Sequence, residues 1–248
     1  MSDRIVVITG ASSGIGAVVA EELARRGATV VLVARREEAL RTVAQRCGPR
    51  AQVIVADVTH RDQVKRVVNE TIKRVGRIDV WVNNAGQGIT RPVSELTGED
   101  IDQMMTVNVK SALYGMQEVL PHFKSRGGGQ IVNVSSMLGR IPYVATRSAY
   151  NGAKHFLNAI TANLREELSS THPNIMVTLV SPGVVRTDFG LNALHGGPDS
   201  RQLPNSQSAE EVAAVMADVI ERPRPDVYTR AGWHQRVVDY YQATGADP

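Results

Sequence analysis

The sequence predicts one α/β domain, a doubly wound and mostly parallel sheet of seven strands with helices on both faces. Short runs rich in valine and isoleucine alternate with amphipathic segments along all 248 residues. Because these runs are almost continuously apolar, both faces of the sheet should be covered, as in parallel sheets with helical crossovers. No repeat, linker or low-complexity segment breaks the alternation, so residues 1–248 are treated as a single domain.

The expected elements follow from period and composition. Seven β-branched runs have strand length: 4–9, 29–34, 51–58, 78–84, 130–136, 175–181 and 226–229. Apolar residues recur at helical spacing in 14–27, 36–48, 61–76, 99–123, 148–168 and 209–221. Gly27, Gly48 and Gly76 close three of these helices, where we expect left-handed C-caps. Ser208 and Glu211 form a capping-box pattern that opens the helix at 209–221.

Charge and cysteine content exclude several function classes. The net charge is +3 and basic residues are interspersed with acidic ones, so we expect no nucleic-acid partner. Cys47 is the only cysteine, which excludes an internal disulfide and a multi-cysteine metal site, and no residue is assigned to a metal. No apolar run approaches the roughly 18 residues of a membrane span, and the N-terminus lacks a signal-peptide pattern. We therefore expect a cytoplasmic protein.

A glycine-rich turn, TGASSGIG at 9–16, joins the first strand to the first helix. Its glycines allow a tight turn and close approach to a ligand, and the free N–H groups of the helix start suit a pyrophosphate. The spacing of the glycines differs from G-x-G-x-x-G, but the position within the first βαβ unit favours a dinucleotide site. The expected contacts are Gly10, Ser12, Ser13, Gly14, Ile15 and Gly16.

The ends of the next strands indicate which dinucleotide. Ala34 stands where an NAD site usually has an acidic residue, and Arg35 and Arg36 follow it. Arginine suits a 2′-phosphate, which favours NADP(H); two solvated arginines are the alternative. Asp57, followed by Val58, either accepts from the adenine amino group or caps its strand. In NNAG at 83–86, the small residues after the fourth strand leave room for an adenosine, giving contacts from Asn84, Ala85 and Gly86.

A tyrosine and a lysine lie four residues apart in YNGAK at 150–154, with only small residues or asparagine between them. One helical turn is about 3.6 residues, so Tyr150 and Lys154 share a helix face. The fifth strand ends in NVSS, which places Ser136 at the same edge of the sheet. Three polar groups therefore converge where open α/β sheets bind ligands.

The ordered set TGASSGIG, NNAG, NVSS and YNGAK resembles the short-chain dehydrogenase/reductase family, in its compact branch of about 250 residues. The resemblance covers nearly the whole chain and implies a Rossmann-type fold. It maps Asn108, Ser136, Tyr150 and Lys154 onto the family's catalytic tetrad, with Tyr150 and Lys154 also contacting cofactor. It maps SPGVVRT at 181–187 onto the segment beside the nicotinamide, with contacts from Pro182, Gly183, Val185 and Thr187.

These roles are consistent with elementary chemistry. The Lys154 ammonium should lower the pKa of Tyr150 from its usual value of about 10 and hold the nicotinamide ribose. Ser136 should hydrogen-bond the substrate carbonyl, with Ser135 as the alternative serine. Asn108 should anchor a water that relays protons to Lys154; without the resemblance it would be assigned to a helix surface.

The sequence therefore predicts an NADP(H)-dependent oxidoreductase acting on a small ketone or secondary alcohol that is itself apolar. An NAD-linked alcohol dehydrogenase of the same family is the first alternative. A non-catalytic dinucleotide-sensing protein is the second, although such a protein should have lost the Tyr–Lys pair.

Two irregular or terminal segments complete the prediction. Residues 186–208 should form a substrate lid that covers the ligand with Phe189, Leu191 and Leu194 and hinges at 196–198. The opposite wall is assigned to Met137, Leu138, Ile141 and Val144. Residues 231–248 should form a C-terminal helix with an apolar face made of Trp233, Val237, Tyr240 and Tyr241. That face could pack on the rest of the same chain, cover the entrance to the substrate site or contact a neighbouring subunit.

The resemblance also implies a homo-oligomer, a dimer or tetramer built on the helices at 98–125 and 147–170. Phe156, Ile160 and Leu164 form an apolar stripe on the second of these. Packing on the sheet is an equally good explanation of that stripe.

Overall fold

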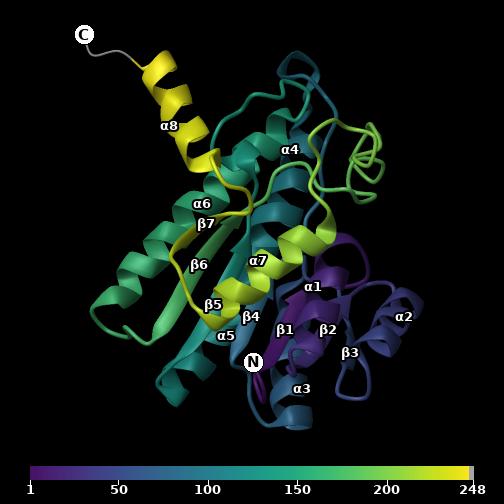
Figure 1. The fold of residues 1–248 in the computed structure, drawn as a ribbon, viewed down its shortest axis with the longest axis vertical. Coiled ribbons are helices and arrows are strands. Elements are labelled where there is room, and N and C mark those ends of the chain that lie inside the picture. The colour runs from purple at the N-terminus through teal and green to yellow at the C-terminus, as the bar shows by residue number, and fades with distance from the viewer. Residues whose placement is uncertain (246–248) are drawn as a thin grey trace.

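A computed structural model describes residues 1–245, and the last three residues of the predicted tail, 246–248, lie outside the described residues. Within that part, one sheet of seven parallel strands runs in the order β3-β2-β1-β4-β5-β6-β7 (Figure 1). The strands are β1 (Ile5–Thr9), β2 (Thr29–Ala34), β3 (Gln52–Val55), β4 (Val80–Asn83), β5 (Gly129–Val134), β6 (Ile175–Ser181) and β7 (Asp226–Tyr228). The predicted doubly wound fold is confirmed.

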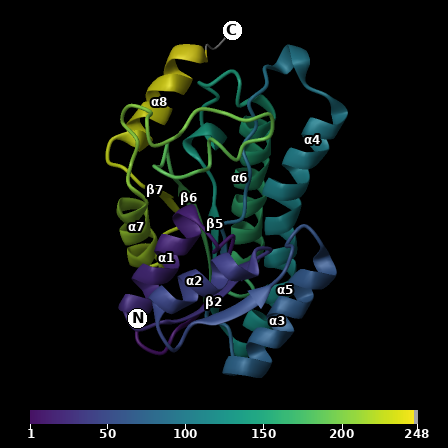
Figure 2. The same ribbon diagram turned by 90° about the vertical axis from the view of Figure 1, so that its right-hand side faces the viewer.

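Helices cover both faces of this sheet. They are α1 (Gly14–Arg25), α2 (Glu37–Cys47), α3 (Arg61–Val75), α4 (Gly98–Met105), α5 (Ser111–Arg126), α6 (Ser148–Ser169), α7 (Ala209–Glu221) and α8 (Trp233–Thr244). Figure 2 shows α3, α5 and α6 on one side of the sheet and α1 and α7 on the other. No helix among residues 1–245 is long and apolar enough to cross a membrane.

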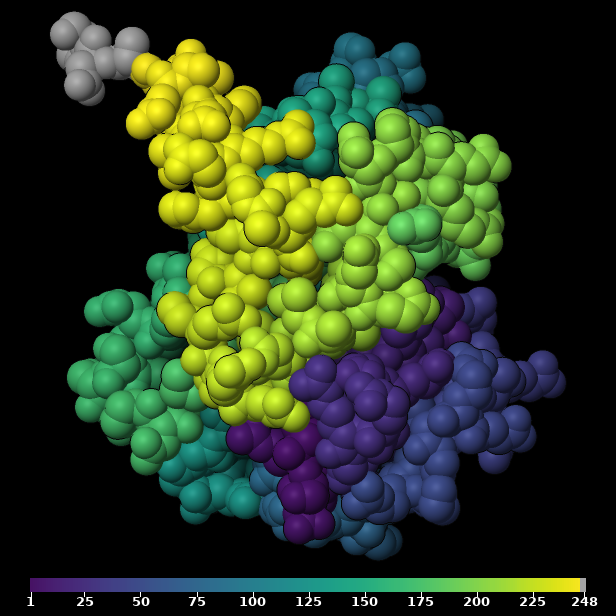
Figure 3. Space-filling model, viewed as in Figure 1, coloured from purple at the N-terminus to yellow at the C-terminus, as the bar shows by residue number. Residues whose placement is uncertain are grey.

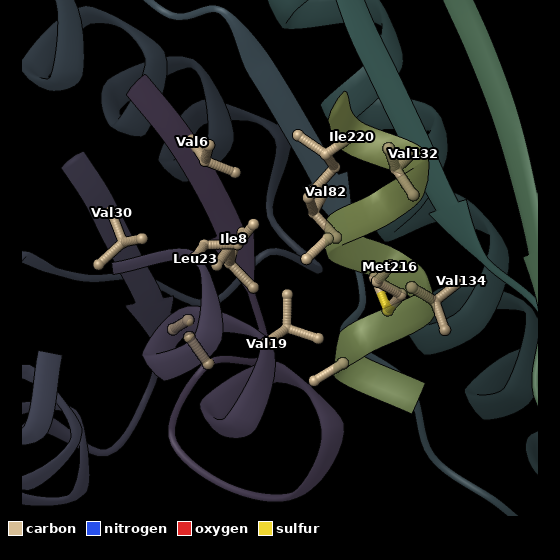
Figure 4. Close-up of a cluster of buried hydrophobic side chains, with 14 of the residues drawn as sticks. Val6, Ile8, Val19, Leu23, Val30, Val82, Val132, Val134, Met216 and Ile220 are labelled. Atoms are coloured by element: carbon tan, nitrogen blue, oxygen red, sulfur yellow. The ribbon is translucent and has the colours of Figure 1, made fainter. Parts of the chain in front are cut away.

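The strands are apolar throughout because alternate residues enter two separate cores. Val6 and Ile8 of β1 pack with Val30 of β2 beneath α1 and α7, whereas Ile5 and Val7 face α3 and α5. Figure 4 shows the first core, where side chains of β1, β2, β4 and β5 point toward Val19 and Leu23 of α1 and toward the α7 side chains Met216 and Ile220. These residues are buried, so a charge at any of them would lack a partner.

Three sequence expectations need correction. The single helix predicted at 99–123 is instead α4 and α5 joined by a π-helical segment, η2 (Thr106–Lys110). Gly76 adopts the left-handed C-cap (φ 86°, ψ −28°), but Gly48 has an extended ψ of −173° and does not. The strand predicted at 51–58 ends at Val55, because the chain leaves the sheet there and Asp57 forms a turn.

The order of the strands determines where a ligand can bind. β1 pairs with β2 on one side and with β4 on the other. The chain leaves the carboxyl end of β1 toward the face covered by α1, and it leaves the carboxyl end of β4 toward the opposite face, covered by α5. Such a switch point leaves a crevice at the carboxyl edge. TGASSGIG, NNAG and NVSS lie at the carboxyl ends of β1, β4 and β5, and YNGAK lies in the first turns of α6, the helix that follows β5.

Helix α8 packs loosely on the rest of the molecule. It contains no buried residue, and Figure 3 shows the yellow C-terminal segment extending beyond the body, beside the loop that precedes α7. Its contacts are nevertheless specific. Trp233 lies against Gly183, where an added Cβ would fall 1.5 Å from the ring, and the Tyr241 hydroxyl donates to the Arg140 carbonyl at 2.8 Å.

Candidate active site

The glycine-rich turn after β1 packs tightly against the end of β4. Gly10 has a φ of 67°, and a Cβ on it would lie 2.9 Å from the Ala85 Cα. Gly16 is equally confined, since its Cβ would lie 2.5 Å from the Gly10 carbonyl oxygen. Asn84 fastens the two segments by donating from Nδ2 to the Thr9 carbonyl at 2.9 Å. A side chain at either glycine would clash with neighbouring backbone, so both positions require glycine whether or not a ligand binds.

The N-terminus of α1 differs from those of α4 and α7. Thr97 and Ser208 begin α4 and α7 with capping boxes, whereas Ser13 at the start of α1 makes no side-chain cap. The first turn of α1 also lacks an acidic residue. The first N–H groups of α1 are therefore available to an anionic ligand such as a pyrophosphate.

Arg36 lies directly against this turn. Its guanidinium donates to the Ser12 and Ser13 hydroxyls at 3.2 and 3.1 Å. Arg35 is exposed, and its guanidinium lies 4.0 Å from the Asp57 carboxylate. The ends of β1, β2 and β3 thus bring two cations and two hydroxyls together.

Asp57 adopts the capping role that was one of its two predicted readings. Its Oδ1 accepts from the Thr59 N–H at 3.0 Å and from the Thr59 hydroxyl at 2.7 Å. Burial acts to raise the pKa of Asp57, but these hydrogen bonds and Arg35 outweigh it, so the pKa is lowered overall. Val58 beside it packs against the α3 side of the core.

Tyr150 and Lys154 are both buried on one face of α6. The Lys154 Nζ lies 5.6 Å from the centroid of the Tyr150 ring and donates to the Val134 carbonyl at the end of β5, at 2.9 Å. The predicted pairing on a common helix face is therefore observed. The small residues between them, Gly152 and Ala153, leave the lysine stem free to reach the sheet.

The electrostatics differ from the sequence expectation. Burial raises the pKa of Tyr150 to about 12, although the Ser136 hydroxyl and the charge of Arg147 act to lower it. Burial also lowers the pKa of Lys154 to about 8. The prediction that the pKa of Tyr150 is lowered is thus wrong, because burial of the phenol outweighs the neighbouring groups that act to lower it.

The two adjacent serines after β5 have different partners. The Ser135 hydroxyl donates to the Asn158 Oδ1 at 2.5 Å, and Asn158 donates in turn to the Gly139 carbonyl at 2.6 Å. Ser136 instead lies near enough to Tyr150 for its hydroxyl to act to lower the pKa of the phenol, and it accepts from the Leu138 N–H at 3.1 Å. The geometry favours Ser136 as the serine that faces a substrate, and Asn158 fixes the turn that carries it.

Asn108 lies in the π-helical segment and is buried, so its alternative assignment to a helix surface is wrong. Its Nδ2 donates to the Gln87 carbonyl at 2.9 Å, and its Oδ1 accepts from the Gln87 N–H at 3.1 Å. A Cβ on Gly86 would lie 3.0 Å from that Oδ1 and 3.6 Å from the Lys154 Nζ. Asn108 and Lys154 therefore flank the same glycine, which brings the four residues of the predicted tetrad into one region.

Comparison with known proteins is consistent with this arrangement. The family profile described as short chain dehydrogenase matches residues 4–195. The chain belongs to the short-chain dehydrogenase family. An uncharacterized oxidoreductase of Staphylococcus epidermidis is 37% identical over 196 residues, 77% of this chain and 84% of that protein.

Solved structures give the same result. A 3-ketoacyl-(acyl-carrier-protein) reductase from Brucella melitensis, complexed with NADH, has a TM-score of 0.84 at 26% identity and covers 94% of this chain and 98% of its own. An alcohol dehydrogenase from Thermococcus sibiricus, complexed with 5-hydroxy-NADP, has a TM-score of 0.81 at 25% identity over 94% of this chain and 98% of its own. The chain is therefore an oxidoreductase of this family with a nucleotide-binding Rossmann fold.

The segment 181–187 of this oxidoreductase forms a wall directly beside the glycine-rich turn. The Pro182 carbonyl accepts from the Met137 N–H at 2.7 Å, which joins the segment to the turn that carries Ser136. Val185 is buried, and the Thr187 Cγ2 lies 3.5 Å from where a Cβ on Gly14 would be. Gly183 accommodates Trp233, so the tail helix rests on this wall.

The predicted lid, 186–208, lies over the tyrosine and is fastened near its middle. The Phe189 ring stands edge-on to the Tyr150 ring with centroids 5.6 Å apart. Leu194 donates to the Gly88 carbonyl at 2.8 Å, and the His195 Nε2 lies 2.7 Å from the Asp100 Oδ1 of α4. On the predicted opposite wall, Met137 and Ile141 are buried, whereas Leu138 and Val144 are partly exposed.

Sequence reasoning missed the residues that support the site from outside the motifs. Asn158 lies one turn beyond Lys154, and that spacing on the same helix was the available signal. Arg147 precedes Tyr150 by three residues, close enough for its charge to act on the phenol. The contact of His195 with Asp100 joins residues 95 positions apart and left no signal in the sequence.

Proposed function

We propose that the chain is an NADP(H)-dependent oxidoreductase that transfers a hydride between the nicotinamide and a ketone or secondary alcohol, with Tyr150 as general acid and base. The observation that carries this proposal is the joint burial of Tyr150, Lys154, Ser136 and Asn108 at the carboxyl edge of the sheet. Buried titratable groups with altered pKa values at a ligand crevice are typical of catalytic sites.

The residues at the other end of the crevice fit a dinucleotide. The uncapped start of α1 and the close-packed glycines suit a pyrophosphate, and Arg36 is positioned between that turn and the end of β2. We assign Arg35 and Arg36 to the 2′-phosphate of NADP(H), because arginine binds phosphate through its planar fork. An NAD-linked alcohol dehydrogenase would not need cations at this position. It is therefore the second candidate, after the NADP(H)-dependent enzyme.

The chain's own residues divide the chemistry as follows. A nicotinamide held in this crevice would supply or accept the hydride. Tyr150, protonated at neutral pH because its pKa is about 12, donates the proton to the carbonyl oxygen during reduction. Ser136 donates a hydrogen bond to the same oxygen as negative charge develops there. Lys154 holds the nicotinamide ribose, and Asn108 completes the path along which Tyr150 is reprotonated.

The direct test is a screen for NADPH and NADH oxidation with ketones, aldehydes and quinones. The proposal expects oxidation with at least one ketone and a preference for NADPH of at least tenfold in Kd, about 1.4 kcal/mol. A preference for NADH would overturn the cofactor assignment alone. Tight dinucleotide binding without turnover of any carbonyl would favour the dinucleotide-sensing alternative.

We also propose a homo-oligomer built on α4, α5 and α6. Phe156 of α6 is 48% exposed, as is Ile101 of α4, whereas Ile160 and Leu164 pack inward. Phe156 and Ile101 therefore leave exposed apolar area that a second copy of the chain would bury. Light scattering at micromolar concentration should give a multiple of the chain mass, and a monomer would overturn this assignment.

A further inference from the structure

Arg147 is a partly exposed cation at the edge of the proposed substrate site. It directly precedes α6, and Tyr150 is three residues further along the chain. Its guanidinium donates to the Ile89 carbonyl at 3.1 Å. Within residues 1–245 no carboxylate lies within 4.0 Å of it, so its charge is not neutralised by an ion pair.

The surroundings of Arg147 place it beside the reacting groups. A Cβ on Gly88 would lie 3.0 Å from the Arg147 Nη1 and also 3.0 Å from the Phe189 Cε1. Phe189 in turn stands edge-on to Tyr150. Phe189 therefore contacts the buried Tyr150 ring and also lies against Gly88, which the partly exposed Arg147 guanidinium approaches as well.

A second polar group without a partner lies close to the guanidinium. The Thr90 hydroxyl is buried and has no hydrogen-bond partner among the described residues. A Cβ on Gly197 would lie 2.8 Å from that hydroxyl and 3.2 Å from the Arg147 Nη2. A buried hydroxyl and a partly desolvated guanidinium are both stabilised when an acceptor binds between or beside them.

The local charge is positive. Lys154 and Arg147 lie on either side of Tyr150 along the chain. The carboxylate of Asp100 on the neighbouring α4 is already occupied, because its oxygens lie 2.8 Å from the Arg91 Nη1 and 2.7 Å from the His195 Nε2. Such a site attracts an anion more strongly than a neutral ligand of the same shape.

We infer that Arg147 is a specificity-determining residue that binds a carboxylate on the substrate, so that the preferred substrates are oxo acids rather than neutral ketones. This inference replaces the apolar substrate that the sequence predicts. This inference rests on the proposed function. A planar carboxylate accepts two hydrogen bonds from the guanidinium fork, which a neutral ester of the same length cannot do equally. Arg147 stays protonated throughout, while the carbonyl carbon takes the hydride and its oxygen takes the proton of Tyr150.

The test compares oxo acids with their own methyl esters: pyruvate, acetoacetate and levulinate, each against its ester. In the wild-type enzyme, kcat/KM should favour the acid in at least one pair. Arg147→Gln should lower that acid-to-ester ratio tenfold or more, mainly through KM, because the carboxylate is bound equally before and during the chemical step. Arg147→Lys keeps the charge but lacks the planar guanidinium fork, so its acid-to-ester ratio should lie between those of the wild type and Arg147→Gln.

Two controls separate this role from others. Arg61→Gln removes an exposed charge at the start of α3 that pairs with Glu118 of α5, and it should leave the ratio unchanged. An equal loss of kcat for acid and ester, with a shifted pH profile, would mean that Arg147 acts only on Tyr150 and would overturn the inference. Equal losses with a lowered Tm would overturn it too, since Arg147 would then only fasten the 88–89 and 197 segments.

A binding measurement keeps the inference independent of turnover. Calorimetry should show that levulinate binds the wild-type protein, in the presence of NADP⁺, at least tenfold tighter than it binds Arg147→Gln. Methyl levulinate should bind both proteins alike. Equal levulinate affinities would overturn the inference even if ketones are reduced, whereas a lack of any carbonyl turnover would overturn the proposed function alone.

Discussion

Replacing Lys154 by methionine is expected to stabilise the cofactor-free protein while removing its activity. Burial lowers the pKa of Lys154 from 10.5 to about 8, and each pKa unit corresponds to 1.36 kcal/mol. The buried ammonium therefore costs the folded state about 3 kcal/mol at neutral pH. Methionine has a similar length and no charge, but it leaves the Val134 carbonyl without its donor, which costs about 1 kcal/mol. The net expected gain is about 2 kcal/mol.

The sign of the pH dependence follows from the direction of the shift. The pKa of Lys154 is lower in the folded protein than in the unfolded chain, so the ammonium destabilises the fold fully below about pH 8. That cost declines as the pH rises from about 8 toward 10.5. The advantage of Lys154→Met should therefore fall by about 2 kcal/mol between pH 6 and pH 9.5. This range stays below the region near pH 10 to 12 in which Tyr150 itself contributes.

Urea unfolding without cofactor, at fixed protein concentration, measures both the stability gain of Lys154→Met and its change with pH, if the m-values of the variant and the wild type agree. Lys65→Met on the exposed face of α3 is the matched control and should change the free energy of unfolding little at any pH in this range. The reasoning would be refuted by a Lys154→Met protein that is less stable at pH 7, or by a difference that does not vary with pH.

Two further predictions concern the supports of the site. Asn158→Leu should lower kcat tenfold or more while changing the Kd of NADPH less than threefold, because Ser135 and Gly139 lose their hydrogen bonds to Asn158 but the dinucleotide contacts remain. Asn158→Gln should recover part of the lost kcat. An unchanged kcat in Asn158→Leu would show that Ser136 needs no such support. Arg35→Ala combined with Arg36→Ala should reduce the preference for NADPH over NADH to less than threefold in calorimetry, and a preference retained in full would assign the 2′-phosphate to other groups.

The sequence predicted the fold because each local signal agreed with its neighbours. Strands such as Ile5–Thr9 are apolar at every position, and only a sheet covered on both faces accommodates that pattern. The glycine-rich turn and the Tyr150–Lys154 pair could be placed for a similar reason, since strand order and helical period bring motif residues to one edge. Their catalytic and cofactor roles stay predictions.

The features that the sequence did not reveal depend on three-dimensional context. The π-helical segment around Asn108 adds one residue to a helix whose apolar spacing still reads as continuous. The upward shift in the pKa of Tyr150 arises from burial, which the spacing of two residues does not report. The Asp100–His195 contact joins α4 to the predicted lid, a loop without a periodic pattern. Each of these needed the packed structure.

The most direct test of the central claim follows the hydride itself. NADPH carrying deuterium at the transferable position of nicotinamide C4 is incubated with a ketone found in the screen, and the alcohol product is analysed by mass spectrometry. The wild-type enzyme should place deuterium on the carbinol carbon. Tyr150→Phe should form no labelled alcohol while its Kd for NADPH stays within a few-fold, because only the proton donor is lost. Labelled alcohol formed by Tyr150→Phe at a rate close to that of the wild type would contradict the account.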